Sequence, residues 1–250
     1  MDIRVTSQAS DVQHTARAAF MDLFRSCPIP DKELLSHLGL FLRRQVVARM
    51  LYLNELYLKA MPVPGVIVEL GVRWGQSLAL FESFRGLYEP FNHGREIIGF
   101  DTFAGFPSVS PQDGTHSIAA HGAFGVSDDY DEYLARVLDY HESEAPMAHL
   151  KKYRIVRGDA CVEFPKYLGE HPETIVALAY FDFDLYEPTR VCLEHLRDHL
   201  VKGSVVAFDE LHLREFPGET LAVREVLGLR NCRLVRSALA GSYQAYMVVE

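Results

Sequence analysis

Acidic side chains recur at the ends of short apolar runs along this chain of 250 residues. Each run has the apolar, β-branched character of a buried parallel strand. The acids that end the runs are Glu69, Asp101, Asp159, Asp182 and Asp209. The carboxyl ends of strands in an open α/β sheet face a common crevice, in which ligands bind. One aspartate before a helix is often only a cap, but five acids in register indicate a polar site.

The turn after the first run carries the most specific pattern, in the stretch 64–77 (PGVIVELGVRWGQS). Glu69 is followed by Gly71, Gly75 and Ser77 before helical spacing begins. Glycines let a ligand approach the backbone, and the helix N-terminus offers unpaired N–H groups. The spacing Glu-x-Gly-x-x-x-Gly differs from the Gly-x-Gly-x-x-Gly of dinucleotide-binding turns. The pattern predicts a nucleoside site of another kind.

Two further strand ends extend this predicted nucleoside site. Asp101 lies about 30 residues beyond Gly71, where the second strand of a Rossmann-type unit places an acid for ribose hydroxyls. Phe103 is able either to stack on a base or to pack in the core. Asp159 and Ala160 follow the third run and are expected on the rim of the same pocket.

A second set of acids follows the fourth and fifth runs, whose strands are neighbours in most sheets of this kind. Asp182 and the pair Asp209-Glu210 are carboxylates with no cysteine or clustered histidine beside them, which indicates Mg²⁺, Ca²⁺ or Mn²⁺ rather than zinc. Such an ion would acidify a bound hydroxyl, so that a nearby carboxylate could take its proton. Asp184, with Glu187 three residues on, is expected to cap the following helix, and its part in the metal site stays open.

The elements that must position these side chains follow from the periodicity. Five strand–helix repeats predict an α/β fold: a Rossmann-like, doubly wound, mainly parallel sheet, closed by a C-terminal antiparallel hairpin around Ala240-Gly241. Residues 1–61 are predicted to form an N-terminal helical extension, with amphipathic segments at 11–24 and 31–60. We expect this extension to be a lid or a contact in a homo-oligomer.

The remaining residues, 62–250, are predicted to form one catalytic domain. Within it, the polar stretch 107–150 reads as an insertion or lid over the substrate, because long irregular segments in compact domains are usually functional. His116 and His121 are expected to be solvated loop histidines, and an exposed helix is predicted from Asp128 to Tyr140.

Composition narrows the class of protein. The net charge of −9 argues against a nucleic-acid partner, which would favour a basic face. No run approaches the ~18 apolar residues of a membrane span, and the first residues, MDIRVTSQASD, lack the pattern of a signal peptide. A cytoplasmic protein with no membrane partner is therefore expected.

Five stretches together resemble the motifs of the macrocin O-methyltransferase family: VELGVRWGQS, IIGFDTFAGFP, VRGDA, FDFDLYEPT and VVAFDE. The resemblance covers about residues 62–250. It implies a class I methyltransferase that uses S-adenosylmethionine and Mg²⁺ to methylate a sugar hydroxyl in natural-product biosynthesis. The acceptor it implies is a small molecule: a deoxysugar such as rhamnose, activated on a nucleotide or already part of a glycoside.

The resemblance also implies roles for individual residues. The methionine part of the cofactor would be lined by Glu69, Gly71, Gly75 and Ser77, the ribose held by Asp101, the adenine covered by Phe103, and its amine bordered by Asp159 and Ala160. The metal would be bound by Asp182, Asp209 and Glu210, with Asp182 as the general base and His212 as the alternative base. The family often has Asp-Gly-Asp at 182–184 and Asp-Asp at 209–210, where this chain has Asp-Phe-Asp and Asp-Glu.

Two alternatives remain open from the sequence. An NAD-dependent oxidoreductase would share the fold, but the missing Gly-x-Gly-x-x-Gly and the paired metal carboxylates weigh against it. A non-catalytic, methyltransferase-like binding module would also share the fold, and the full set of five strand-end acids weighs against it.

Overall fold

The computed structural model describes residues 9–239, 241 and 243–250. Two sequence-based predictions therefore lie partly outside the described residues: the lack of a signal peptide, which rests on residues 1–8, and the turn at Ala240. Within the described part of the chain, no helix is both long and apolar enough to cross a membrane.

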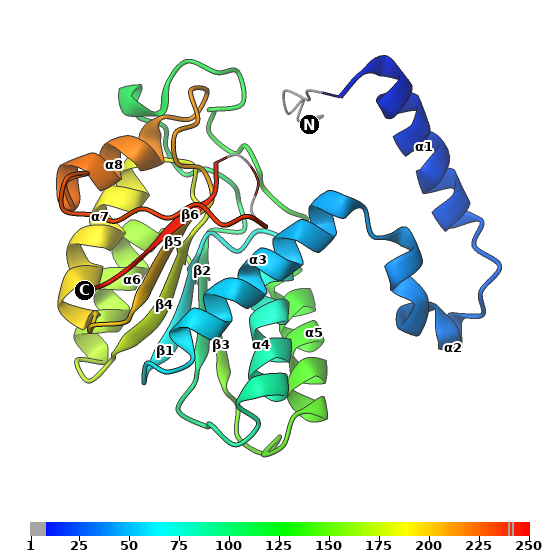
Figure 1. The fold of residues 1–250 in the computed structure, drawn as a ribbon, viewed down its shortest axis with the longest axis horizontal. Helices are drawn as coiled ribbons and strands as arrows, with labels where there is room; N and C mark the ends of the chain where they lie inside the picture. Colours follow the sequence, from blue (N-terminus) through cyan, green and yellow to red (C-terminus); the bar gives the residue numbers. More distant parts are fainter. Residues whose placement is uncertain (1–8, 240, 242) are drawn as a thin grey trace.

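A six-stranded sheet forms the centre of the molecule, with helices on both of its faces (Figure 1). Its strand order is β3-β2-β1-β4-β5-β6, in which β1 to β5 are parallel and β6 runs antiparallel to β5. The strands are β1 (Val66–Leu70), β2 (Ile97–Asp101), β3 (Tyr153–Arg157), β4 (Val176–Phe181), β5 (Val205–Phe208) and β6 (Ala245–Val248). The predicted doubly wound α/β fold is confirmed.

The helices divide between the two faces of the sheet, and an arm precedes them in the chain. The arm consists of α1 (Asp11–Arg25), α2 (Asp31–Leu34) and the 3₁₀ helix η1 (Leu35–Phe41). On one face lie α3 (Arg44–Ala60), α4 (Gln76–Tyr88) and α5 (Tyr130–Glu144), and on the other α6 (Ala160–Glu170), α7 (Tyr186–Leu196) and α8 (Gly218–Val226). Two further 3₁₀ turns are η2 (Pro111–Asp113) and η3 (Arg197–His199).

Alternating strand residues supply a hydrophobic core on each face of the sheet, as expected for strands buried on both sides. Ile67 and Tyr180 belong to the core under α3, α4 and α5, whereas Val68 and Phe181 belong to the core under α6, α7 and α8. All four side chains are fully buried. The sheet is therefore held from both sides, and its carboxyl edge is a rigid support.

Three predicted elements differ from the structure. The single helical segment predicted over 31–60 is wrong, because Leu42 and Arg43 are extended and separate η1 from α3. The helix predicted at 128–140 is present as α5 but is not fully exposed, since Leu134 and Leu138 are buried against α4. In the described part of the tail, β6 is the one strand, and Val235 makes an isolated antiparallel bridge to Tyr246.

The arm and α3 differ sharply in burial. α1, α2 and η1 contain no buried side chain, and Figure 1 shows α1 projecting away from the sheet. In contrast, Tyr52, Leu53 and Leu56 of α3 are fully buried in the core on the sheet. The sheet face thus fixes the C-terminal part of α3, while the arm before it makes little contact with the core.

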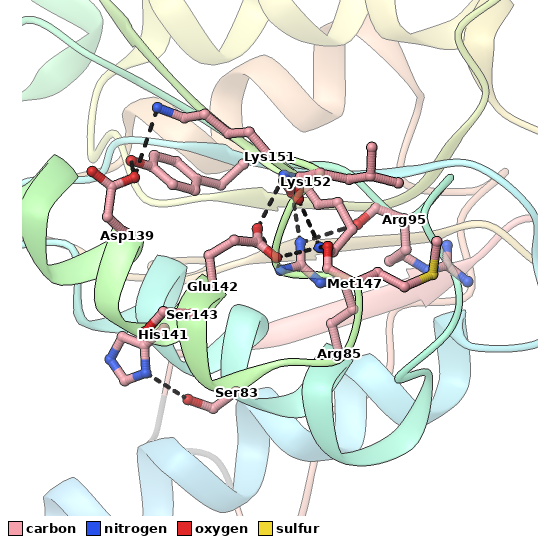
Figure 2. Close-up of polar contacts among 12 residues, drawn as sticks. Ser83, Arg85, Arg95, Asp139, His141, Glu142, Ser143, Met147, Lys151 and Lys152 are labelled. Atoms are coloured by element: carbon pink, nitrogen blue, oxygen red, sulfur yellow. Dashed lines mark hydrogen bonds and ion pairs between the residues drawn. The ribbon is translucent and has the colours of Figure 1, made fainter.

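A buried cluster of charged side chains fixes α5 and the following connection at the edge of the sheet opposite the strand-end acids (Figure 2). Arg85 of α4 donates to Glu142 Oε2 (2.9 Å) and to the carbonyl oxygen of Lys152 (2.6 Å). Glu142 also forms an ion pair with the ammonium of Lys152, which donates to the carbonyl oxygen of Met147 (3.0 Å). These contacts satisfy buried charges that would otherwise be costly.

Glu82 lies in the same region without such partners. It is buried, and neither of its carboxylate oxygens has a hydrogen-bond partner among the described residues. Burial raises the pKa of Glu82 to about 8, with the charge of Arg85 opposing the shift and that of Glu142 adding to it. An acid whose pKa is raised on folding favours the folded state at low pH and costs stability as the pH rises through that pKa.

We therefore predict that Glu82→Gln changes the pH dependence of stability. The free energy of unfolding of the variant, relative to the unchanged protein, should increase from pH 5 to pH 9 by roughly 4 kcal/mol, at about 1.4 kcal/mol for each unit between pH 5 and the raised pKa. Thermal and urea unfolding across this range would measure it. The control is Glu144→Gln, at an exposed position of the neighbouring helix α5, which covers the same face of the sheet as α4. A pH-independent difference for Glu82→Gln would contradict the prediction.

Candidate active site

A cavity of about 610 Å³ lies at the carboxyl ends of the parallel strands. Each of the segments that follow β1, β2, β3, β4 and β5 contributes to its lining. The cavity is centred where the strand order reverses, between β1 and β4, which is where α/β sheets bind ligands. Its volume falls within the range of small-molecule and cofactor sites.

The glycine turn after β1 is required by close packing. Gly71 has φ +99°, and a Cβ at this position would lie 2.1 Å from the carbonyl oxygen of Asp182. Gly75 has φ +75°, and its Cβ would lie 2.4 Å from a methyl group of Leu134. Both residues line the cavity, as does Ser77 in the first turn of α4. The predicted glycines thus let the turn pass between β4 and α5.

Asp101, at the end of β2, organises this turn. Its Oδ2 accepts from the backbone N–H groups of Val72 and Arg73, both at 2.7 Å, and its Oδ1 accepts from the N–H of Phe103 at 2.6 Å. A carboxylate held by three backbone donors is fixed in orientation. Asp101 lines the cavity, as predicted from its spacing, and it also sets the shape of the loop that a nucleoside would meet.

The other four predicted cofactor residues take different places. Asp159 caps α6 by accepting from the N–H of Cys161 (2.9 Å), and both Asp159 and Ala160 line the cavity. Phe103 is buried in the core under α4 and α5 and is not among the residues that line the cavity. Glu69 lies beneath the cavity inside β1, where burial and the charge of Asp182 raise its pKa well above the ordinary value.

The acids after β4 and β5 meet a guanidinium group. Arg49, in α3, donates from Nη2 to Asp182 Oδ2 (2.7 Å) and from Nη1 to Asp209 Oδ1 (2.8 Å). Asp209 Oδ1 also accepts from the Tyr180 hydroxyl (2.5 Å) and from Gln244 Nε2 (2.9 Å). Asp182 and Asp209 do come together, as the spacing predicted, but an arginine lies between them.

Negative charge in this region still exceeds the positive charge that faces it. Burial, together with the charge of Asp209, raises the pKa of Asp182 to about 7 against the opposing effect of Arg49. Burial, with Asp209 and Asp182 beside it, likewise raises the pKa of Glu210 to about 7. Burial and the charge of Glu210 raise the pKa of Asp184 well above its ordinary value. Four carboxyl groups therefore share one small region of the cavity.

The prediction that Asp184 caps the following helix is wrong. The N-cap residue of α7 is Leu185, and its side chain makes no capping hydrogen bond. The N–H of Tyr186, the first residue of α7, instead donates to Asp113 Oδ1 (2.5 Å), from the 107–150 insertion. Asp184 has φ +62° and lines the cavity. The insertion thus takes over the capping and leaves Asp184 facing the site.

His212 is placed apart from the other predicted residues. It is exposed, and it is not among the residues that line the cavity. Its backbone N–H donates to the Thr220 hydroxyl (2.8 Å), which fixes the loop rather than the imidazole. The imidazole is therefore poorly placed to take a proton from a substrate in the cavity.

The strand-end acids offer the donors of a hard cation but are not arranged around one in this conformation. Among the described residues, no group of three or more His, Cys, Asp or Glu side chains is spaced to hold a metal ion. Glu210 Oε2 is nevertheless buried with no hydrogen-bond partner there, and the Arg49 guanidinium already places a positive charge between Asp182 and Asp209. The carboxylate oxygens are of a type that binds a cation, and the guanidinium of Arg49 already pairs with two of these carboxylates.

Arg49 was not among the residues predicted from the sequence, although its position in the helix indicates that it is partly buried. Arg49 precedes Tyr52 by three residues, Leu53 by four and Leu56 by seven, so it lies on the face of α3 that the core covers. An arginine on the buried face of an amphipathic helix needs an acidic partner.

Comparison with protein families matches residues 47–225 to the macrocin-O-methyltransferase family. A crystal structure of CalS11, calicheamicin methyltransferase, is similar at 43% identity and a TM-score of 0.93, over 99% of this chain and 96% of that chain. The apo structure of CalS11, described as TDP-rhamnose 3'-O-methyltransferase, is similar at 40% identity and a TM-score of 0.84, over 99% of both chains.

A more distant structure, the O-methyltransferase NovP, has 20% identity and a TM-score of 0.59 over 81% of this chain and 80% of that chain, and it bears on the fold alone. The comparison with curated proteins gave no match.

The geometry of the glycine turn leads to a prediction. Gly71→Ala should destabilise the protein by roughly 3 kcal/mol or more, because the methyl group would collide with the Asp182 carbonyl at an unfavourable φ. Gly169→Ala is the matched control: it lies in α6 with nothing within 4 Å of its Cβ, so helix propensity should add about 0.5–1 kcal/mol. Chemical unfolding would measure both, and equal stabilities for the two variants would contradict the assignment.

Proposed function

The chain belongs to the macrocin O-methyltransferase family, and from this premise we propose that it transfers a methyl group to a hydroxyl of a nucleotide-activated deoxysugar of the rhamnose type. In coarser terms, it is an S-adenosylmethionine-dependent sugar O-methyltransferase with a small-molecule substrate. The proposal rests chiefly on one observation: a single cavity has the glycine turn in one part of its lining and the cluster of Asp182, Asp209 and Glu210 in another.

The turn after β1 suits the methyl donor. The backbone approaches the cavity at Gly71 and Gly75, and the N–H groups at the start of α4 are available to a carboxylate. Asp101 would face the ribose hydroxyls, while Asp159 and Ala160 would border the adenine. In place of Phe103, the neighbouring Thr102 lines the cavity on this side.

The nature of the acceptor is proposed from the relatives and from two residues that line the cavity. CalS11, described as a TDP-rhamnose 3'-O-methyltransferase, is similar over nearly the whole length of both chains. The side chains of Arg73 and Trp74 line the cavity; the Arg73 guanidinium lies 4.9 Å from the Phe124 ring centroid, and the Trp74 side chain is 47% exposed. A guanidinium and aromatic rings suit the phosphates and base of a nucleotide.

The transfer itself needs position and charge more than covalent chemistry. The acceptor oxygen attacks the methyl carbon of the sulfonium in line with the sulfur, the C–S bond breaks with its electron pair passing to sulfur, and S-adenosylhomocysteine leaves. The proton of the hydroxyl passes to a carboxylate, for which we propose Asp182, since it lines the cavity between the turn and Asp209. Holding the two reactants in contact supplies most of the acceleration.

We also propose that a divalent cation, Mg²⁺ in the first place, takes part. The residues that would hold it are Asp182, Asp209 and Glu210, whose oxygens are of the hard type that Mg²⁺ prefers. When bound, the cation would supply Lewis-acid chemistry, making a sugar hydroxyl more acidic. The unpartnered Glu210 Oε2 and the positive guanidinium of Arg49 between the two aspartates support a cation here.

A homo-oligomer stays a prediction. Val12 and Leu23 of α1 are 79% and 64% exposed in a single chain, and α1 has no buried residue. Apolar surface of this extent on a helix is typical of a contact with another chain or segment.

The first test addresses the reaction. Asp182→Asn should lower the rate of methyl transfer to TDP-rhamnose at least ~100-fold, because the acceptor proton loses its base. Its affinity for S-adenosylmethionine, measured by titration calorimetry, should change little. Mass spectrometry of the sugar product gives the rate, and a panel of rhamnosides measured in parallel would show whether a glycoside is preferred.

Full turnover in the variant would remove Asp182 from the proposed role, and binding of NAD instead of S-adenosylmethionine would overturn the methyltransferase proposal.

The second test addresses the cation. Dialysis against a chelator should reduce methyl transfer strongly, and added Mg²⁺ should restore it, because the alkoxide developing near four carboxyl groups needs a positive charge. S-adenosylmethionine binding after dialysis serves as the control for an intact fold. Undiminished turnover in the chelated protein would show that the reaction proceeds without a metal.

A further inference from the structure

Arg49 occupies the position between Asp182 and Asp209 from which a bound cation would act. One nitrogen of the guanidinium donates to each carboxylate, at 2.7 and 2.8 Å, so a single delocalised charge bridges the ends of β4 and β5. The same Nη2 lies 3.4 Å from the Ser77 hydroxyl, and the guanidinium carbon lies 5.7 Å from the Tyr180 ring centroid. The bridge is thus enclosed on several sides by the floor of the cavity.

The Arg49 bridge and a divalent ion would use the same two carboxylates. Asp209 Oδ1 already accepts from Arg49, Tyr180 and Gln244. A divalent ion bound by Asp182 and Asp209 would lie within a few ångströms of the guanidinium, and two positive charges at that distance repel strongly in a partly buried site. The two cations therefore compete for these carboxylates.

Arg49 is also well placed to leave. It lies near the beginning of α3, just before the residues that anchor this helix in the core, whereas the arm that precedes α3 has no buried side chain. The Arg49 side chain is 25% exposed, toward the cavity. A change of its rotamer, or a small movement of the first turns of α3, can free the carboxylates without disturbing the sheet.

We infer that Arg49 is the resident counter-ion of Asp182 and Asp209 in the metal-free protein, and that it competes with the divalent cation for these two carboxylates. The guanidinium holds the acids in register while no metal is bound and is displaced when the metal enters. This inference rests on the proposed metal dependence. It assigns to α3 a direct link between the cation site and the arm in front of it.

Competition predicts the opposite effect of an Arg49 substitution on metal binding from the one expected for a residue that only supports the ligands. Removing a side chain that merely holds the ligands in place should weaken metal binding, whereas removing a competitor should strengthen it. Arg49→Gln keeps hydrogen-bonding capacity and removes the charge. Arg49→Lys keeps the charge on a side chain of similar reach. Arg44→Gln removes a charge from an exposed position at the start of the same helix and is the matched control.

The experiment is a calorimetric titration of Mg²⁺, and separately Mn²⁺, into chelator-stripped protein without methyl donor or acceptor. Arg49→Gln should bind the ion roughly 5- to 150-fold more tightly than the unchanged protein, the range typical of coupled binding events. Arg49→Lys and Arg44→Gln should stay close to the unchanged protein. Melting temperatures provide a second readout: stripped Arg49→Gln should melt lower than the unchanged protein, and saturating Mg²⁺ should raise it by the larger increment.

Equal or weaker binding by Arg49→Gln, with clear binding by the unchanged protein, would overturn the inference and leave the proposed metal dependence intact. Binding by neither protein would overturn both. Binding by Arg49→Gln alone would support the competition and contradict the proposed metal dependence of the unchanged protein.

Discussion

The close approach of β1 and β4 is the constraint on which the site depends. The N–H of Asp182 donates to the carbonyl oxygen of Leu70 (2.8 Å), and Gly71 leaves no room for a side chain beside the Asp182 carbonyl. Because the strand order reverses between these two strands, the loops that leave them diverge and open a crevice. The glycine turn that we propose for the methyl donor therefore lies beside the acid after β4, and the proposed transfer needs no long-range movement to bring donor and acceptor together.

Burial of so many acids at this edge has a cost that the surroundings offset only in part. Arg49 supplies one positive charge, and Asp101 and Asp159 are satisfied by backbone N–H groups. Asp182, Asp184 and Glu210 keep raised pKa values because burial and mutual repulsion disfavour their charged forms. This excess of negative charge favours a cation, which supports the proposed placement of the divalent ion and of the positive sulfonium of the methyl donor.

The sequence predicted what depends on local pattern and on the general geometry of the fold. The strands and their parallel order follow from apolar runs and connection rules, and both are present. Four of the five predicted strand-end acids line the cavity, and Glu69 is buried beneath it. The resemblance assigned Phe103 to the adenine, whereas the residues alone left packing in the core open; the side chain, at φ +56°, is buried in the core. Asp184 was assigned to a cap that Asp113 provides from more than 70 residues away (186 − 113 = 73). Contacts of this kind, between segments far apart in the chain, produce no periodic pattern in the sequence from which they could be predicted.

The 107–150 insertion and the arm before α3 differ in how firmly they are held. An apolar cluster of Phe106, Ile118 and Phe216 joins the insertion to the loop after β5, and all three side chains also line the cavity. The Asp113 contact with α7 ties the same insertion to the sheet. The arm before α3 has no comparable anchor among its described residues. A fixed apolar wall is suited to excluding water and to shaping a pocket for the proposed sugar, whereas a weakly held arm linked to Arg49 is suited to responding to what enters the proposed cation site. On the proposals made above, substrate discrimination and cation loading would be carried by different segments of one domain.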